Sequence, residues 1–219
     1  MIDFKQLCIY CGQKKAAELD HIPPKCFFPS PRPNNLITVP SCKDCNRRYG
    51  KVDEQARNLI TSLERTEVHN AIQSKLSIKR DRSYRRKQGK FNFYDILDSI
   101  VIADVVSSNG IYLGKAPAFN LDTPMMNLFI ERMTRALLFY ENSIGYVKCE
   151  VEWRMAPTKK DMEVMPSEIK QLLLSAKVRE VGGGIFSYAG LFRSGNINSL
   201  WILSFYSGIE FMSIIRESH

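Results

Sequence analysis

The sequence lacks the long apolar runs, the leader and the phosphate-binding loop that mark several large classes of protein. No run approaches the roughly 20 apolar residues that span a bilayer. The first residues, Met-Ile-Asp-Phe-Lys-Gln, do not resemble a signal peptide. No G-x-x-x-x-G-K-S/T motif occurs, so the run Gly182-Gly183-Gly184 is interpreted as a bend or the start of a strand. We therefore expect a cytoplasmic protein that has no membrane partner.

The composition is that of a basic globular protein whose charge is unevenly distributed. The chain has 219 residues, of which 44% are hydrophobic, and a formal net charge of +8. Residues 1–90 hold 19 Lys and Arg against 9 Asp and Glu, whereas residues 91–219 hold 12 against 14. The positive first part favours a polyanionic partner, and binding should weaken strongly with salt. The change in composition near residue 90 predicts two domains, 1–66 and 91–219, joined by a helical and basic linker over 67–90.

Four of the six cysteines form two Cys-x2-Cys pairs. Cys8 and Cys11 precede a polar segment, and Cys42 and Cys45 follow it. This spacing is typical of a structural zinc site in which four thiolates surround the ion. Gly12 can adopt the positive φ with which backbone amides turn toward the sulfurs. Disulfides or reduced core thiols are the alternative, and they fit less well because nothing else in the sequence indicates secretion.

The segment between the cysteine pairs contains residues suited to cleaving a phosphodiester. That reaction needs a base for water and a cation for the charge on the phosphate and the leaving oxygen. His21 is the candidate base, since an imidazole is a neutral acceptor at physiological pH. Asp20 and Asn46 offer hard oxygen ligands, which suit Mg²⁺ or Mn²⁺, while the thiolates suit zinc.

The same segment resembles the HNH endonucleases, the ββα-metal nuclease family. The match covers residues 8 to about 55. It consists of an Asp-His-Ile-x-Pro strand at Asp20, an Asn-Leu-Ile strand at Asn35, and a helix that opens with Cys-x2-Cys-Asn and ends the motif at Asn46. The resemblance implies a catalytic set of Asp20, His21, Asn35 and Asn46, an HNN variant. Asn35 would hold the loop that orients His21, with Asn34 as the neighbouring candidate.

Basic side chains after this motif are candidates for contact with nucleic acid. Arg47, Arg48 and Lys51 lie at the start of the expected helix, where they can grip phosphates, although a solvated helix face is the alternative. Seven of the twelve residues 79–90 are cationic, among them Arg82, Arg85 and Arg86. This run is interpreted as a flexible linker that orders on nucleic acid, or as a soluble hinge between domains.

The apolar periodicity predicts an α+β fold. The expected helices cover about 46–66, 68–78, 91–106 and 167–177, and a further helix opens at Thr123-Pro124. Strands are expected at 111–118 and 147–155, and an antiparallel meander at 185–192, 200–206 and 209–215. With the resemblance, the fold class becomes an N-terminal zinc-bound ββα module followed by a mixed C-terminal domain. The aromatic side chains of the meander are expected in the core.

The function indicated by these features is metal-dependent hydrolysis of DNA, most simply double-stranded DNA. By family analogy, the chain would be the effector of a restriction or phage-defence system, controlled by a sensor protein, and it could act as a homodimer. A zinc-dependent nucleic-acid-binding module without catalysis is the alternative, and an RNA-directed nuclease toxin is the third hypothesis. The role of residues 91–219 is expected to be recognition, oligomerisation or docking of a partner.

Overall fold

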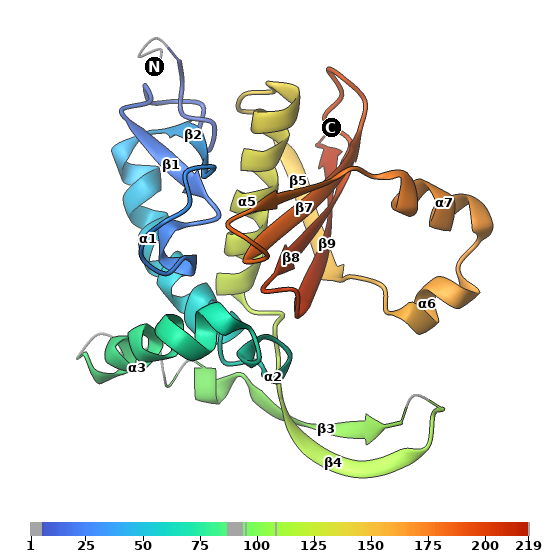
Figure 1. Ribbon diagram of the computed structural model, residues 1–219. Helices are drawn as coiled ribbons and strands as arrows, with labels where there is room; N and C mark the ends of the chain where they lie inside the picture. Colours follow the sequence, from blue (N-terminus) through green and yellow to red (C-terminus); the bar gives the residue numbers. More distant parts are fainter. Residues whose placement is uncertain (1–5, 87–93, 95, 108, 219) are drawn as a thin grey trace.

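The protein has the mixed α+β architecture that its sequence predicts (Figure 1). The computed structural model describes residues 6–86, 94, 96–107 and 109–218. The N-terminal part consists of two antiparallel strands and a long helix: β1 (Glu18–Ile22), β2 (Ile37–Ser41) and α1 (Lys43–Ile60). A short 3-10 helix, η1 (Lys25–Phe27), follows β1. Among the described residues, no helix is both long and apolar enough to cross a bilayer.

The helical segment after β2 is interrupted at residues 61–63, inside the predicted first helix, and again at residues 68–69. It continues in α2 (Glu64–Glu67), in the π-helical turn η2 (Ile72–Leu76) and in α3 (Ser77–Arg85). The helices expected over 46–66 and 68–78 are therefore present, the first of them as α1 and α2.

Helix α3 corrects the prediction that residues 79–90 form a flexible linker or hinge. The hydroxyl of Ser83 donates to Glu54 (2.6 Å) and accepts a bond from Asn58 (3.1 Å), and Arg80 donates to the carbonyl oxygen of Thr61. These bonds hold residues 79–85 against α1, so the high charge of this run does not keep it unfolded. Residues 87–90 lie outside the described part of the chain.

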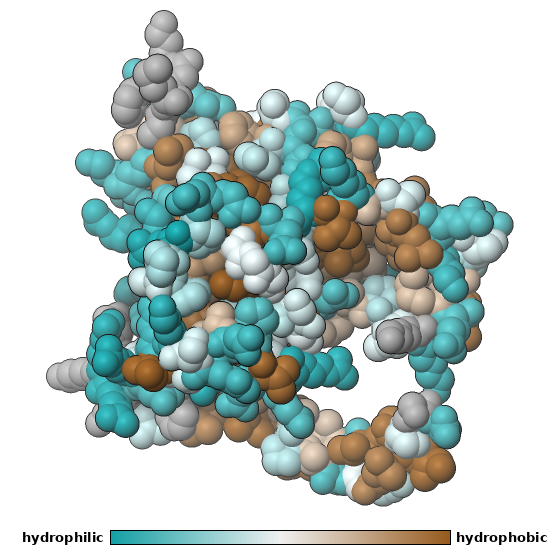
Figure 2. All heavy atoms as spheres, in the orientation of Figure 1, coloured by the Kyte–Doolittle hydropathy of each residue, from teal (hydrophilic) through white to brown (hydrophobic). Residues whose placement is uncertain are grey.

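The helix expected over 91–106 is also corrected, because most of its apolar residues form a β-hairpin. Of the described residues in this range, Tyr94 and Ile96–Asp98 are helical. Strand β3 (Ile100–Val106) pairs antiparallel with β4 (Tyr112–Phe119), and residues 91–93 and 95 are not described. Five of the seven residues of β3 are Ile or Val, which lose rotamer freedom in a helix and suit a strand. The hairpin projects from the body, and its apolar side chains are exposed (Figures 1 and 2).

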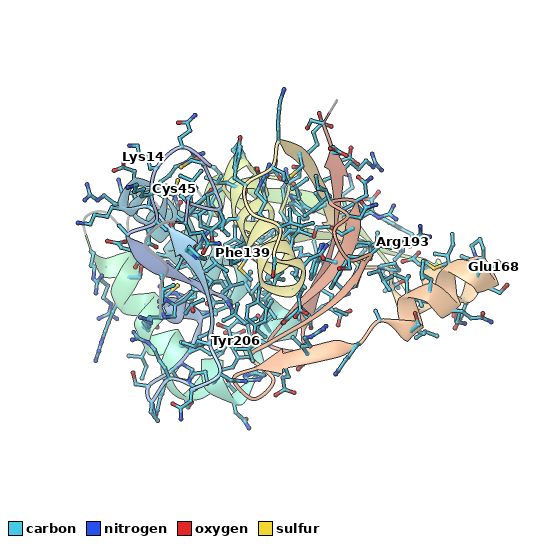
Figure 3. The ribbon with its side chains drawn as sticks, turned by 90° about the horizontal axis from the view of Figure 1, so that it is seen from above. Lys14, Cys45, Phe139, Glu168, Arg193 and Tyr206 are labelled. Carbon is cyan, nitrogen blue, oxygen red and sulfur yellow. The ribbon has the colours of Figure 1, made fainter. Side chains whose placement is uncertain are left out.

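The C-terminal part is a five-stranded antiparallel sheet with the order β5-β9-β8-β7-β6. Its elements are α5 (Pro124–Asn142), β5 (Cys149–Met155), α6 (Lys159–Val164), α7 (Ser167–Ser175), β6 (Val178–Val181), β7 (Phe186–Phe192), β8 (Ser199–Phe205) and β9 (Ile209–Glu217). The predicted meander and the strand at 147–155 are confirmed, as is Thr123 as the N-cap of α5. Glycines 182–184 form the turn between β6 and β7, all with positive φ. Helices α6 and α7 project to one side of the molecule, where Figure 3 labels Glu168 of α7.

Helix α5 lies between the N-terminal part and the five-stranded sheet (Figure 1), and the core is continuous across it. Phe27 of η1 packs against Phe129 of α5 and Phe205 of β8, with ring centroids 5.5 and 5.3 Å apart. The hydroxyl of Tyr206 donates to the carbonyl oxygen of Phe27 at 2.9 Å. Trp201, Phe205 and Tyr206 are buried, as expected for core residues. Side chains from 1–66 and from 91–219 thus share one apolar cluster.

Candidate functional site

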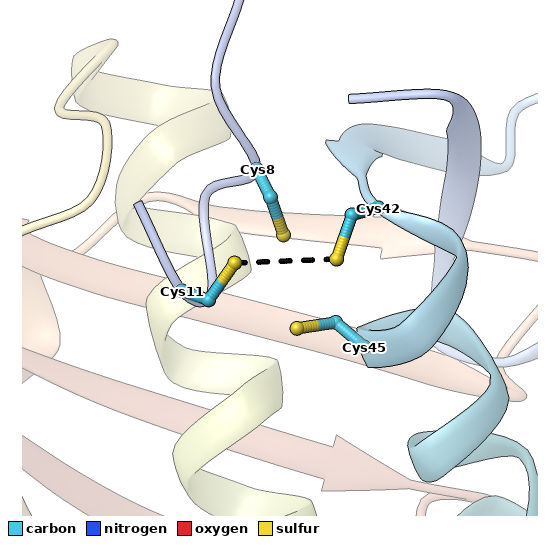
Figure 4. Close-up of side chains that lie close together, drawn as sticks. All are labelled: Cys8, Cys11, Cys42 and Cys45. Atoms are coloured by element: carbon cyan, nitrogen blue, oxygen red, sulfur yellow. Dashed lines mark hydrogen bonds between the residues drawn. The ribbon is translucent and has the colours of Figure 1, made fainter. Parts of the chain in front are cut away.

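The two Cys-x2-Cys pairs come together in space, as their spacing predicts (Figure 4). Cys8 and Cys11 lie on the loop before β1, Cys42 is the N-cap of α1, and Cys45 lies in the first turn of that helix. All four Sγ atoms lie within 4.8 Å of one another, and those of Cys11 and Cys42 are 4.0 Å apart. A tetrahedral zinc ion with bonds of about 2.3 Å needs sulfurs roughly 3.8 Å apart. The four cysteines, hereafter the cysteine cluster, can therefore hold a metal ion such as zinc.

The backbone around the first pair is shaped for this arrangement. Gly12 has φ of +63°, and its N–H donates to the carbonyl oxygen of Cys8 at 2.9 Å. The N–H of Cys8 donates to the carbonyl oxygen of Lys14 at 2.8 Å, which closes the loop. The ammonium of Lys14 pairs with Asp44, so the loop is also tied to the first turn of α1.

The thiols differ in how readily they ionise. Burial alone would raise the pKa of Cys11, but hydrogen bonds from the backbone of Gln13 and Lys14 lower it to about 7. Burial raises the pKa of Cys8 and of Cys45. A cation would therefore have to deprotonate these two thiols, as metal binding does in thiolate sites. None of the six cysteines is in a disulfide, so the alternative of paired disulfides is wrong.

A cavity of about 470 Å³, hereafter the first cavity, opens beside the end of β1. His21, Asp20 and Asn46 all line it, so the structure brings together three of the predicted catalytic residues. Asp20 and His21 are neighbours on a strand, and both reach the cavity because β1 ends at the next residue, Ile22. Its other polar walls come from Lys25, Cys26, Asp53, Glu54, Arg57 and Lys79.

The carboxylate of Asp20 is buried and accepts four hydrogen bonds. One oxygen, Oδ2, accepts from the hydroxyl of Tyr10 (2.6 Å) and from Nε of Arg132 (2.9 Å). The other, Oδ1, accepts from the N–H of His21 (2.9 Å) and from Nη2 of Arg132. A carboxylate offers about four lone-pair positions. All four are used here, so Asp20 is not free to bind an ion in this arrangement.

Arg132 is the residue of this site that the sequence did not reveal. It comes from α5, is 1% exposed, and also pairs with Asp53 of α1. Its guanidinium lies 4.9 Å from the ring centroid of Tyr49. Burial raises the pKa of Asp53 to about 7, and the charge of Arg132 opposes that shift. The available signal was position: Arg132 lies three residues after Phe129 on the apolar face of α5, where an unpaired charge would be costly.

The remaining predicted site residues are placed as follows. Asn46 Nδ2 donates a hydrogen bond to the Glu18 carboxylate at 2.5 Å. This bond uses the amide nitrogen, so the side-chain carbonyl oxygen of Asn46 is not bonded to Glu18. Asn35 does not line the first cavity; its side chain is exposed and donates to the carbonyl oxygen of Glu180 in β6 (3.2 Å). Asn34 is also exposed and does not line the cavity. Their expected role in orienting His21 has no contact to support it.

The predicted nucleic-acid contacts fall into three groups. Arg47, Arg48 and Lys51 are exposed on the first turns of α1. Arg82 and Arg86 line a second cavity beside α3, whereas the exposed side chain of Arg85 does not.

Comparisons with protein families, with curated proteins and with solved structures found no match for this chain.

Proposed function

We propose that this chain is a divalent-metal-dependent endonuclease of the HNH type that hydrolyses DNA phosphodiester bonds. The observation that supports it best is the first cavity. His21 from the end of β1 and Asn46 from the first turn of α1 line it together, and Asn46 directly follows Cys45 of the cysteine cluster. Zinc bound by the cysteine cluster would stabilise the small ββα unit, because metal binding contributes to its folding free energy. The stabilised unit would hold the base His21 and the oxygen donor Asn46 on one wall of the first cavity.

His21 is the proposed general base. Burial lowers the pKa of His21, with a further contribution from the nearby Lys25. Its imidazole is therefore neutral at physiological pH and can accept a proton from water. That water would attack phosphorus, forming one P–O bond while the bond to the leaving oxygen breaks.

A Mg²⁺ or Mn²⁺ ion would neutralise charge on the phosphate and on the leaving oxygen. Asn46 and Asp20 are the proposed ligands, because amide and carboxylate oxygens are the hard donors that these ions prefer. Asp20 can serve only if it releases one of its four hydrogen bonds, most directly one from Arg132. Of the two ligands, Asn46 is the better placed.

A zinc-dependent nucleic-acid-binding module without catalysis is the second candidate, and the saturation of Asp20 favours it. In the part of the chain that the structure describes, the cysteine cluster is the one close group of three or more His, Cys, Asp or Glu ligands. Both candidates use the same zinc unit and the same basic surface, so binding alone does not separate them.

Cleavage of supercoiled plasmid in Mg²⁺ or Mn²⁺ separates the two functions. The native protein should nick or linearise the plasmid, and His21→Ala should abolish cutting while it still binds DNA. His69→Ala is the matched control, because His69 contacts Tyr206 and does not line the first cavity.

Three outcomes would contradict the proposal. Cutting that survives in His21→Ala removes His21 as the base. Absence of cutting in every protein, with DNA binding retained, supports the binding module. Faster digestion of RNA than of DNA under the same conditions supports the toxin hypothesis.

A further inference from the structure

The second cavity, of about 420 Å³, lies between the loop at residues 28–30 and one face of η2 and α3. Four cations line it: Lys75, Lys79, Arg82 and Arg86. They are spaced four, three and four residues apart, which places them on one face of a helix. This surface, hereafter the basic groove, extends over roughly 16 Å at 1.5 Å per helical residue.

The basic groove lies next to the first cavity. Lys79 lines both, and its ammonium donates to the carbonyl oxygen of Cys26, another residue of the first cavity, at 3.2 Å. Lys75 donates to the carbonyl oxygen of Ser30 at 2.7 Å. The two lysines thus hold the loop that forms the opposite wall, and Lys79 places the groove beside the cavity that His21 lines.

The described part of the chain leaves the charges of the basic groove without ion-pair partners. No carboxylate lines the groove, and within the described residues none of its four cations is in an ion pair. The contrast is clear on the same helix, where Arg80 lies within 4.0 Å of the carboxylates of Glu67 and Asp81. Neighbouring like charges repel, and a bound polyanion would relieve that repulsion.

We infer that the basic groove binds the phosphate backbone of the nucleic-acid strand whose scissile phosphate lies beside His21. This inference rests on the proposed function for the position of the cut. At about 3.4 Å per nucleotide along one strand of a duplex, the groove spans roughly five nucleotides. Ammonium and guanidinium groups contact phosphates without reading bases, so binding along the groove is independent of sequence.

Arg82 provides the sharpest test, with Arg85 as its matched control. Both are exposed on α3, and replacing either with Gln removes one positive charge, but only Arg82 lines the groove. Lys75 and Lys79 are left intact, because they also hold the loop. Binding of a fluorescent 30-base-pair duplex is followed by anisotropy over a range of NaCl concentrations. Every protein carries His21→Ala, so that no substrate is cut.

We expect Arg82→Gln to weaken binding several-fold and to flatten the slope of log K against log salt by about 0.9, as loss of one phosphate contact does. Arg85→Gln should bind as the His21→Ala parent does. The same titration with single-stranded DNA and with single-stranded RNA of the same sequence shows which of the three nucleic acids binds the groove most tightly.

Equal effects of Arg82→Gln and Arg85→Gln would overturn the inference, because net charge alone would then explain the binding. Lack of binding by the parent at low salt would overturn it as well. The proposed function can fail separately: if the native chain does not cut while Arg82→Gln alone weakens binding, the groove stands and the endonuclease falls.

Discussion

At the scale of the residue, both the backbone conformation at position 12 and the side chain packed against it require glycine there. The φ of +63° at Gly12 is one that residues other than glycine rarely adopt, and an added Cβ would overlap the ring of Tyr146. We expect Gly12→Ala to lower the free energy of unfolding by about 1–3 kcal/mol and to weaken zinc retention. Thermal unfolding with zinc analysis measures both effects.

Gly50→Ala is the control for Gly12→Ala. Gly50 lies within α1, its φ is not positive, and nothing lies within 4 Å of an added Cβ. Alanine in a helix interior is favoured over glycine by about 0.5–1 kcal/mol. If Gly12→Ala leaves stability as high as Gly50→Ala does, the tight contact between the first cysteine loop and Tyr146 is not required.

The buried ion pairs of Arg132 lead to a second prediction at this scale. Arg132→Met leaves two buried carboxylates, Asp20 and Asp53, without their cation. Breaking a buried pair from one side costs about 3–5 kcal/mol, and urea unfolding should show a loss of that size. Arg216→Met removes an exposed pair with Glu152 and should cost under about 1 kcal/mol. Similar losses in the two variants would mean that the Arg132 pairs are weak.

At the scale of the element, the cysteine cluster joins the loop before β1 to the first turn of α1. Cys42→Ser removes one thiolate and should release the metal, which lowers the helical signal because the ββα unit is too small to fold without it. Circular dichroism and zinc analysis on the same samples test this. Cys149→Ser, at a buried residue of β5 outside the cluster, should keep its zinc. A Cys42→Ser protein with native helicity would show that the cluster is not needed for folding.

Local pattern predicted most elements correctly, and the two wrong predictions have physical causes. Four of the five strands of the large sheet were predicted from their apolar residues, whereas β6 was not, and α5 was predicted from its Thr123 N-cap. In β3, the run of apolar Ile and Val residues suggested a buried helix. Periodicity alone cannot distinguish a short apolar run in a helix from one in a strand, and here the run forms a hairpin. In α3, charge suggested a linker, while the decisive bonds from Ser83 reach α1, which is about 29 residues away in sequence.

The candidate site divides in the same way. The cysteine cluster was predictable because each Cys-x2-Cys pair is local in sequence and its chemistry is specific. His21 and Asn46 were proposed from the family resemblance, and both line the first cavity. Arg132 lies 112 residues from Asp20, and only tertiary packing brings the two together. Pairings at such separation leave no periodic trace in a single sequence.

At the scale of the whole molecule, the chain is held together by an aromatic cluster to which distant segments contribute. Phe27 belongs to the N-terminal part, whereas Phe129, Phe205 and Tyr206 belong to the C-terminal part. The two domains predicted from the charge distribution would unfold separately, while one shared core predicts a single cooperative transition. The division remains a prediction, and unfolding measurements can decide it.

Phe27→Ala should lower the free energy of unfolding by about 3–5 kcal/mol, because it removes a fully buried ring from the shared core. Zinc release reports on the N-terminal part, and the fluorescence of Trp153 and Trp201 on the C-terminal sheet. Both signals should shift together in urea. Leu113→Ala, at a side chain 65% exposed on the hairpin, should change stability by less than about 0.5 kcal/mol. If Phe27→Ala shifts zinc release but leaves the tryptophan transition in place, the two parts are independent domains and the shared cluster contributes little to either.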